Sequence, residues 1–272
     1  MSATGTSLLD QIVAAKKAEI ARIPEDLDIS HAPPPRNFYK ALKNPGGRLA
    51  GSGQSYIPTQ KAIIAECKRA SPSMGLIRRD YKPAAIAEVY ASQGATCISV
   101  LTDQNFFQGD LSHLKEAGRC GLPVLRKDFI ISRQQILEGR FHGADSILLI
   151  VRLLSDSDLS DLLQYGRDLG MEPLVEVHSE EELRRACGAG ARIIGVNHRD
   201  LDTLVMDLSL SERLASILRT LTPDALMVAE SGIEKPETLR HMSEYADAFL
   251  IGTSLMRSPS IEMGWKVLFG AR

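Results

Sequence analysis

The amino-acid sequence predicts an α/β protein, a (β/α)8 TIM barrel that follows an N-terminal helical extension. From about residue 62 onward, eight short apolar runs alternate with segments of helical periodicity. Near-continuous apolar strands between helices are typical of a parallel sheet covered on both faces. Eight such units favour a closed barrel. An open, doubly wound sheet is the alternative that this pattern leaves.

The predicted strands start 20 to 34 residues apart, with helix signals between them. Several of the intervening segments end in glycine, which is common just beyond the C-terminus of a helix. Ser155 and Ser179 stand ahead of acidic first turns, as N-terminal caps do. The strands are expected at residues 62–67, 96–101, 123–129, 144–151, 172–177, 192–197, 226–231 and 247–252.

The first sixty residues do not follow this repeat. Apolar residues at near-helical spacing predict an amphipathic helix over 6–23. Three prolines at 33–35 then interrupt the chain before a short helix near 37–42, and 51–58 is interpreted as a loop. We therefore predict a single domain in two regions: a helical extension over 1–60 that packs on the barrel, and a catalytic barrel over 61–272.

Composition excludes several classes of protein. A chain of 272 residues can bury a large core, and a net charge of −2 excludes a broadly basic nucleic-acid binder. The N-terminus lacks a secretory signature, and no apolar run reaches the ~20 residues that span a bilayer. The four cysteines have no metal-ligand spacing and are interpreted as small buried thiols. We expect a cytoplasmic protein with no metal site and neither membrane nor nucleic acid as a partner.

Polar residues stand at the C-terminal ends of the predicted strands. Because side chains alternate along a strand, Ile64, Glu66 and Lys68 share one face of the first. The same alternation places a polar residue after apolar ones on four further strands, at Lys127, Glu176, Asn197 and Glu230. Ion pairs closing the top of a core are the alternative. Gathering charges in a partly dry site costs several kcal/mol per unpaired ion, which a purely structural barrel has little reason to accept. The cluster therefore favours a catalytic site, and barrel enzymes carry their catalytic groups at this end.

The last two strands end in small residues. Ser231 and Gly232 follow the seventh, and Gly252, Thr253 and Ser254 follow the eighth. Small residues let backbone N–H groups approach an anion, and barrels commonly bind phosphate after these two strands. The alternative is that these are ordinary tight turns. Two small-residue turns at the two places where barrels bind phosphate favour the phosphate site over that alternative. The sequence therefore predicts a small phosphorylated substrate acted on by lysines and carboxylates.

These motifs resemble those of the indole-3-glycerol phosphate synthase family. The stretch IIAECKRASPSMG (63–75) is similar to the family's Glu-x-Lys followed by Ser-Pro-Ser. The resemblance continues in order through 99–114, 123–130, 144–151, 173–183, 193–203, 228–233 and 248–256. It implies a carboxy-lyase of tryptophan biosynthesis, without a cofactor. Such an enzyme closes the indole ring of 1-(2-carboxyphenylamino)-1-deoxyribulose 5-phosphate with loss of carbon dioxide and water.

The resemblance also implies a role for each site residue. Lys127 would be the general acid on the substrate carbonyl, Lys68 would bind the substrate carboxylate and take part in dehydration, and Glu176 would be the base in dehydration. The other implied catalytic residues are Glu66 and Glu230, which would orient the lysines, and Asn197 and Ser231, which would hydrogen-bond the substrate. Those implied to hold its anions are Ser71, Arg199, Gly232, Gly252 and Thr253. Those implied to pack its anthranilate ring are Phe107, Phe129, Leu148, Leu201 and Ile251.

Two positions depart from the family's usual pattern. His198 replaces the second Asn of Val-Asn-Asn-Arg, and alternation turns it away from the Asn197 side, so we expect a supporting or loop role. Met74 replaces a common Lys, which bears on loop closure and substrate affinity more than on chemistry.

Other functions remain as alternatives to this resemblance. One is another phosphate-binding barrel enzyme of the pathway, such as phosphoribosylanthranilate isomerase or the tryptophan synthase α subunit. Those enzymes are expected to use Cys/Asp and Glu/Asp pairs, which the lysine-rich set fits poorly. Another is a non-catalytic phosphate-ligand binder. Monomer and weak dimer both stay open.

Overall fold

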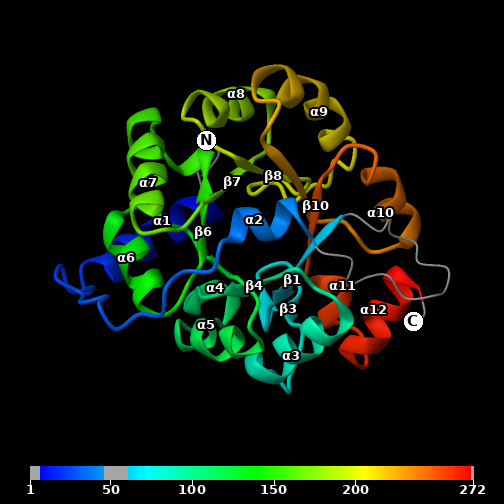
Figure 1. Cartoon of the computed structure of the whole chain (residues 1–272), viewed down its shortest axis with the longest axis horizontal. Helices are drawn as coiled ribbons and strands as arrows, with labels where there is room; N and C mark the ends of the chain where they lie inside the picture. Colours follow the sequence, from blue (N-terminus) through cyan, green and yellow to red (C-terminus); the bar gives the residue numbers. More distant parts are fainter. Residues whose placement is uncertain (1–6, 46–60, 271–272) are drawn as a thin grey trace, which may run out of the picture.

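A closed barrel of parallel strands forms the centre of the molecule (Figure 1). The computed structural model describes residues 7–45 and 61–270, and within these ranges eight strands pair in the order β1-β10-β9-β8-β7-β6-β5-β4. They are β1 Ala62–Cys67, β4 Cys97–Leu101, β5 Val124–Lys127, β6 Ser146–Ile150, β7 Leu174–Val177, β8 Ile193–Asn197, β9 Leu226–Glu230 and β10 Ala248–Ile251. The predicted closed barrel is confirmed, and the open-sheet alternative is wrong.

Helices form a ring around the barrel and connect its strands (Figure 1). As predicted, Ser155 and Ser179 cap α7 and α8, where each hydroxyl accepts a backbone N–H of the first turn. The connecting helices are α3 Pro83–Gln93, α4 Gln104–Phe107, α5 Ser112–Ala117, η1 Gly118–Cys120, α6 Arg133–Phe141, η2 Val151–Leu153, α7 Asp156–Asp168, α8 Glu180–Gly188, α9 Leu210–Leu221 and α10 Pro236–Met242. Two further helices follow the last strand, α11 Thr253–Met256 and α12 Ile261–Phe269. A short antiparallel hairpin follows β1, with strands β2 Ala70–Ser71 and β3 Gly75–Leu76.

Side chains alternate along each strand between two hydrophobic clusters. The inner cluster fills the barrel and includes Ile64, Leu125 and Leu174, as the alternation predicted. The outer cluster packs between the strands and the surrounding helices and includes Ile63 and Phe249. The apolar runs of the sequence therefore supply two cores at once, because each strand is buried on both faces.

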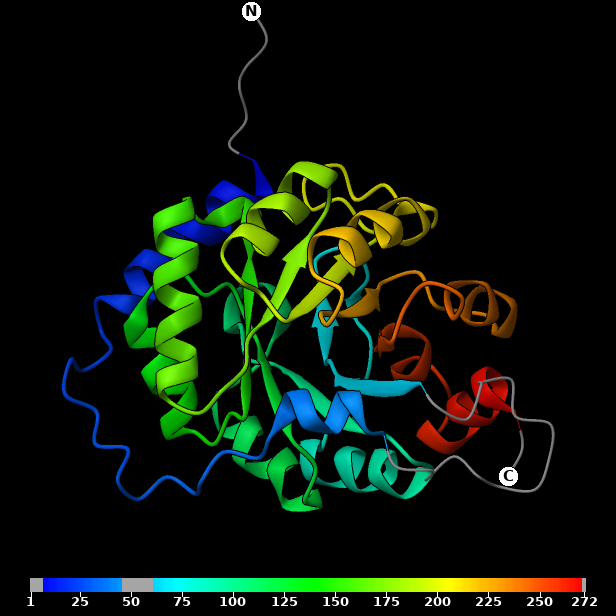
Figure 2. The same ribbon diagram turned by 45° about the horizontal axis from the view of Figure 1, so that its top comes forward.

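The two helices of the N-terminal region lie at opposite ends of the barrel (Figure 2). Helix α1 (Leu8–Ile20) lies at the C-terminal ends of the strands, where its apolar side chains reach the pocket described below. Helix α2 (Phe38–Lys43) closes the other end with Phe38 and Leu42, which join the inner cluster. Its Tyr39 ring lies 4.0 Å from the guanidinium of Arg192, the residue before β8. The predicted loop over 51–58 and the boundary at 60 lie outside the described residues.

The cysteines and the helices allow two further comparisons with expectation. All four thiols are free, but only Cys67 and Cys97 are buried, whereas Cys120 and Cys187 are half-buried. The prediction of small buried thiols is therefore wrong for the latter two, which stand at the ends of outer helical segments, η1 and α8, rather than within strands. Within the described ranges, no helix has the length and apolarity to cross a membrane.

Candidate active site

The C-terminal ends of the strands surround a pocket that brings together the residues predicted from the sequence. The predicted residues that line it are Glu66, Lys68, Ser71, Phe107, Lys127, Phe129, Leu148, Glu176, Asn197, Arg199, Leu201, Ser231, Gly232, Ile251, Gly252 and Thr253. Glu230 is the exception, because its side chain is only 1% exposed and contacts Lys127 without lining the pocket. One face of the strand ends therefore gathers two lysines and three carboxylates.

Lys127 lies among the three carboxylates. Its Nζ donates to Glu230 Oε2 at 2.6 Å and lies 3.6 Å from Glu176 Oε2 and 3.9 Å from Glu66 Oε2. Burial disfavours the ammonium, but Glu230, Glu176 and Glu66 together raise the pKa of Lys127 above its usual range. Lys127 is therefore protonated near neutral pH, which is the state that a general acid needs.

The pKa values of Glu230 on β9 and Glu176 on β7 are shifted in opposite directions. Burial and the Glu176 charge raise the pKa of Glu230 to about 7, although Lys127 opposes the shift. Burial acts the same way on Glu176, but Lys127 and His178 outweigh it and hold the pKa of Glu176 at about 2. Asn197 Nδ2 also donates to Glu176 Oε1 at 3.1 Å. Paired groups whose environments separate their pKa values are typical of acid–base sites.

Glu66 joins the two lysines. Its Oε1 lies 2.7 Å from Lys68 Nζ, while Oε2 faces Lys127. Burial favours the neutral carboxyl, but Lys68 and Lys127 hold the pKa of Glu66 below its usual range. A Cβ at Gly252 would lie 2.2 Å from Glu66 Oε1, so a glycine after β10 leaves the space that this carboxylate occupies. Tyr90 supports the same strand, since its hydroxyl donates to the Glu66 carbonyl at 3.1 Å.

The turns after β9 and β10 both line the pocket, and the first of them has the backbone form expected of a close approach to a ligand. Ser231 and Gly232 both have a positive φ, at 66° and 74°, and such strain in a non-glycine residue is often found at functional sites. Ser254 Oγ donates to the Ile233 carbonyl at 2.9 Å and joins the two turns. Ser71 faces them from the β2–β3 hairpin. The hydroxyl oxygens of Ser71 and Ser73 lie 3.4 Å apart. Together these groups form the small-residue end of the pocket.

His198 takes the supporting position that alternation predicted. Its side chain is 1% exposed, lies outside the pocket lining, and places Nδ1 2.7 Å from the Glu230 carbonyl. A carbonyl only accepts, so Nδ1 carries the proton and Nε2 accepts the Ser211 hydroxyl at 2.8 Å. Burial lowers the pKa of His198 below its usual range, which keeps the ring neutral. The ring thus fixes the backbone from which the Glu230 side chain projects.

The apolar end of the pocket is larger than the sequence predicted. Phe107 and Phe129 pack with ring centroids 6.1 Å apart, within the range of favourable aromatic contacts. Ile251 also borders the pocket, but it belongs to the outer cluster, and Leu250 has the inner position. That Ile251 packs the substrate ring stays a prediction, and alternation along β10 adds Leu250 to the candidates. Strand alternation could have found Leu250, and also Ile150 on β6. Other apolar lining residues that were missed include Leu8, Leu9 and Ile12 of α1.

Comparison with known proteins agrees with this geometry. The family model described as "Indole-3-glycerol phosphate synthase" matches residues 9–268. The chain belongs to the indole-3-glycerol phosphate synthase family. It is 44% identical over 267 residues to a relative of that name from Acetivibrio thermocellus, covering 93% of this chain and 96% of the relative. It is 43% identical to one from Roseiflexus sp., covering 97% and 98%. An "Indole-3-glycerol phosphate synthase 2" from Ralstonia nicotianae is 42% identical, covering 97% of each.

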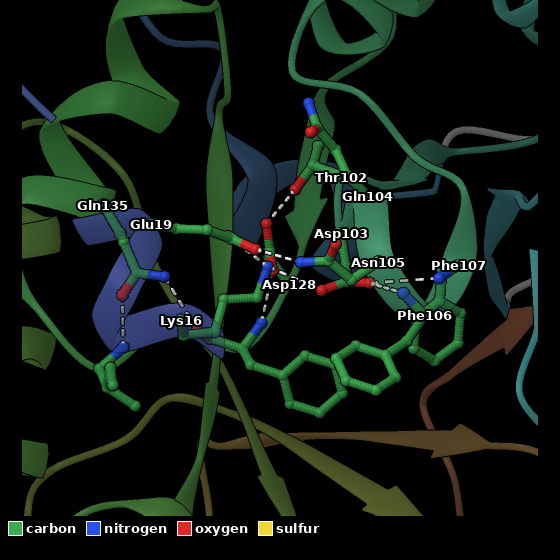
Figure 3. A network of polar contacts seen from close by, with 12 residues as sticks. Lys16, Glu19, Thr102, Asp103, Gln104, Asn105, Phe106, Phe107, Asp128 and Gln135 are labelled. Atoms are coloured by element: carbon green, nitrogen blue, oxygen red, sulfur yellow. Dashed lines mark hydrogen bonds and ion pairs between the residues drawn. The ribbon is translucent and has the colours of Figure 1, made fainter. Parts of the chain in front are cut away.

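In this member of the indole-3-glycerol phosphate synthase family, a buried lysine of α1 forms ion pairs with residues at the C-terminal ends of the barrel strands (Figure 3). Lys16 Nζ lies 2.7 Å from Asp103 Oδ2, 2.9 Å from Asp128 Oδ1 and 2.8 Å from Glu19 Oε2. Burial disfavours its charge, but Asp128 and Asp103 raise the pKa of Lys16 above its usual range. Asp128 directly follows Lys127, so one ammonium joins α1 to the strand end that carries the proposed acid.

Asp103 extends this connection to the aromatic end of the pocket. It is the N-cap of α4, where Oδ1 accepts the backbone N–H groups of Phe106 and Phe107 at 2.6 and 3.1 Å (Figure 3). Lys16 on the other oxygen of Asp103 therefore holds the segment from which Phe107 lines the pocket.

Replacing Lys16 with methionine is expected to loosen α1 and weaken substrate binding. The change leaves the carboxylates of Asp103 and Asp128 buried without their shared cation, and breaking such a pair costs about 3 kcal/mol of unfolding free energy. Denaturant unfolding and KM are the measurements, and KM should rise because α1 lines the pocket. Lys17→Met is the matched control, since Lys17 is exposed on the same helix. Equal stability of the two variants would show that the Lys16 contacts are not needed.

Proposed function

We propose that this chain is an indole-3-glycerol phosphate synthase. It closes the ring of 1-(2-carboxyphenylamino)-1-deoxyribulose 5-phosphate to indole-3-glycerol phosphate, with release of carbon dioxide and water, in tryptophan biosynthesis. Family membership supports the reaction. The observation that carries it for these residues is the Lys127 ammonium, held within 4 Å of three carboxylates beside an aromatic-lined pocket.

Ring closure needs an acid on the substrate carbonyl. The aromatic carbon that bears the carboxylate attacks the carbonyl carbon, a new C–C bond forms, and the carbonyl oxygen gains electron density. Lys127 donates a proton to that oxygen, and its positive charge stabilises the oxygen as it becomes negative. A raised pKa of Lys127 suits this role, because an alkoxide binds a proton more tightly than an amine does.

Decarboxylation and dehydration complete the reaction. The bond to the carboxylate breaks, carbon dioxide leaves as a neutral molecule, and the bonding electrons return to the ring system, so the step requires no cofactor. The hydroxyl from the first step then leaves as water after it gains a proton from a lysine. Glu176, ionised at neutral pH, accepts the proton lost from the adjacent ring carbon. Loss of carbon dioxide restores the benzene ring, and elimination of water completes the aromatic indole.

The rest of the pocket orients the flexible substrate. We assign the phosphate to the small residues of the turns after β9 and β10 together with Ser71, and the anthranilate ring to Phe107 and Phe129. Lys68 and Arg199 are assigned to the anionic groups. Holding both ends of the molecule brings the aromatic carbon toward the carbonyl, which reduces the entropy that ring closure must overcome.

Two alternatives receive less support from the same pocket. A phosphoribosylanthranilate isomerase is expected to use a Cys/Asp pair, and no cysteine lines the pocket within the described ranges. A non-catalytic phosphate binder has no use for the buried lysine among carboxylates, whose desolvation costs several kcal/mol per ion. The proposal further includes a cytoplasmic location, supported by the free thiols, and a barrel over 61–272 as the catalytic region. Whether the chain is a monomer or a weak dimer stays a prediction.

The test is direct. Purified chain is incubated with 1-(2-carboxyphenylamino)-1-deoxyribulose 5-phosphate, and the rise of indole fluorescence is followed over time. Turnover that saturates with substrate is the expected result. Protein that is folded by circular dichroism and yields no indole product would disprove the proposed function.

A further inference from the structure

A buried imidazole stands behind Glu176. His178 directly follows the Glu176 strand, its side chain is 3% exposed, and it is absent from the lining of the pocket. Its Nε2 lies 3.3 Å from Glu176 Oε1, and its Nδ1 lies 3.3 Å from Glu182 Oε2 on α8. The His178 backbone N–H donates to the same Glu182 oxygen at 2.7 Å, which fixes the position of the ring.

The two carboxylates determine the protonation of this ring. An ionised carboxylate faces each ring nitrogen, as a hydrogen-bond partner at Nδ1 and as an ion-pair contact at Nε2, so the two negative charges favour a proton on both nitrogens. Burial opposes the charge, but Glu176 and Glu182 raise the pKa of His178 to about 9. The remaining polar neighbours act on these carboxylates: Asn197 donates to Glu176 from β8, Lys127 faces the other Glu176 oxygen, and Arg152 binds Glu182.

The contacts continue outward from Glu182 to a loop at the pocket. Arg152 Nε donates to Glu182 Oε1 at 3.0 Å, and Arg152 Nη1 donates to Asp200 Oδ2, also at 3.0 Å. Asp200 belongs to the loop after β8, directly after Arg199, which lines the pocket. A continuous row of charged groups therefore joins Glu176 to the loop that carries Arg199.

We propose that His178 is a positioning residue for this reaction: an imidazolium that keeps Glu176 ionised and turned toward the substrate. The inference deepens the proposed function and rests on it. Asn197 alone would fix the direction of the Glu176 carboxylate but would supply no charge. Lys127 supplies charge, yet it loses a proton during ring closure, before Glu176 acts. His178 does not meet the substrate, so its charge is unchanged when Lys127 gives up its proton.

The kinetic consequence separates this role from a structural one. His178→Gln keeps a donor near Glu176 but removes the charge, and one lost charge neighbour at this distance shifts a carboxyl pKa by about one unit or more. We expect kcat to fall about tenfold at pH 7.5, because the Glu176 carboxylate would lose the charge contact that holds its direction. We expect KM to change less than about twofold, because His178 does not line the pocket. The wild-type kcat should also decline as pH rises through about 9, where His178 loses its proton. The variant should lack that decline.

The test combines kinetics with a titration that does not depend on turnover. The histidine C–H resonances of the full-length chain are followed by NMR from pH 5 to 10, with His178 assigned by its loss in His178→Gln. A midpoint near 9 is expected, and Glu182→Gln should lower it while leaving the imidazole in place. Glu180→Gln is the control, because Glu180 lies exposed on the same helix and pairs with Arg184.

Three results would overturn the inference. One is a His178 midpoint at or below the ordinary value of about 6.5. Another is a His178→Gln enzyme with a lower melting temperature but normal kcat and normal pH profile. The third is a Glu182→Gln enzyme that behaves as Glu180→Gln does. With a normal wild-type rate, each would leave the proposed function standing, whereas no turnover by wild type would remove the function itself.

Discussion

Lys127→Ala is expected to lose roughly 10²- to 10⁴-fold in kcat, the contribution of a positioned general acid. The ammonium at this position is within 4 Å of Glu66, Glu176 and Glu230, and a water molecule in its place would supply neither its charge nor its fixed direction. Because the acid acts in the transition state, KM should change far less than kcat. Steady-state fluorescence kinetics measure both constants.

The fold of this variant should survive, with a stability that depends on pH. Without Lys127, three carboxyls remain together in a dry site, and loss of the cation raises the pKa of each. Glu230 already has a pKa of about 7 in the presence of the lysine. A carboxyl whose folded-state pKa exceeds its unfolded value stabilises the fold at low pH, and that stability is lost as pH rises through the folded value. The melting temperature of Lys127→Ala should therefore be higher at pH 5 than at pH 8.

Two further variants test whether the loss of kcat comes from the missing ammonium of Lys127 or from the space that it leaves. Lys127→Met fills more of the vacated space and should show the same loss of kcat. Lys115→Ala removes an exposed lysine of α5 and should leave kcat and melting temperature unchanged. A Lys127→Ala enzyme with near-normal turnover would transfer the acid role to another group, with Lys68 the nearest candidate by its shared contact with Glu66.

The sequence predicted the charged face of the barrel because strand alternation is a local rule. Once Ile64 is placed inside, Glu66 must share its face, and the same holds for Leu174 and Glu176. The rule does not say which carboxylate meets which donor. Asn197 donates to Glu176, whereas Glu230 Oε1 has no hydrogen-bond partner among the residues that the structure describes, and both facts depend on contacts between strands. The opposite pKa shifts of the two carboxyls follow from those contacts.

The position of α1 could not be predicted for a different reason. Its apolar pattern shows that Ile12 has a buried face but does not identify the surface that buries it. Lys16 reads in the sequence as an ordinary surface lysine of an amphipathic helix, like Lys17 beside it. Its partners Asp103 and Asp128 follow strands that come much later, 87 and 112 residues along the chain. Only the closed barrel brings them together.

Gly195→Ala is expected to reduce kcat about 100-fold while the barrel stays folded. A Cβ at this position of β8 would lie 2.1 Å from Glu230 Oε1, which is far inside contact distance. The backbone itself accepts alanine, since Gly195 has no positive φ. The atom in the way is the far end of a flexible side chain, so the Glu230 carboxylate can turn aside. In turning, it would break the 2.6 Å contact with Lys127, and a misplacement of about 1 Å at a catalytic group can cost about 10²-fold in rate.

A control and a rescue variant distinguish this steric effect from a general loss of stability. Gly188→Ala adds the same methyl group on α8, where no atom lies within 4 Å, and should leave the rate unchanged. Adding Glu230→Asp to Gly195→Ala shortens the carboxylate and relieves the clash without restoring its reach to Lys127, so melting temperature should recover while kcat stays low. If Gly195→Ala kept the wild-type rate, the Lys127–Glu230 contact would not matter for catalysis. If melting temperature and kcat both recovered in the double variant, Gly195 would serve packing alone. On this account Gly195 is needed because the buried Glu230 carboxylate, which orients Lys127, occupies the space that a side chain on the neighbouring strand would take.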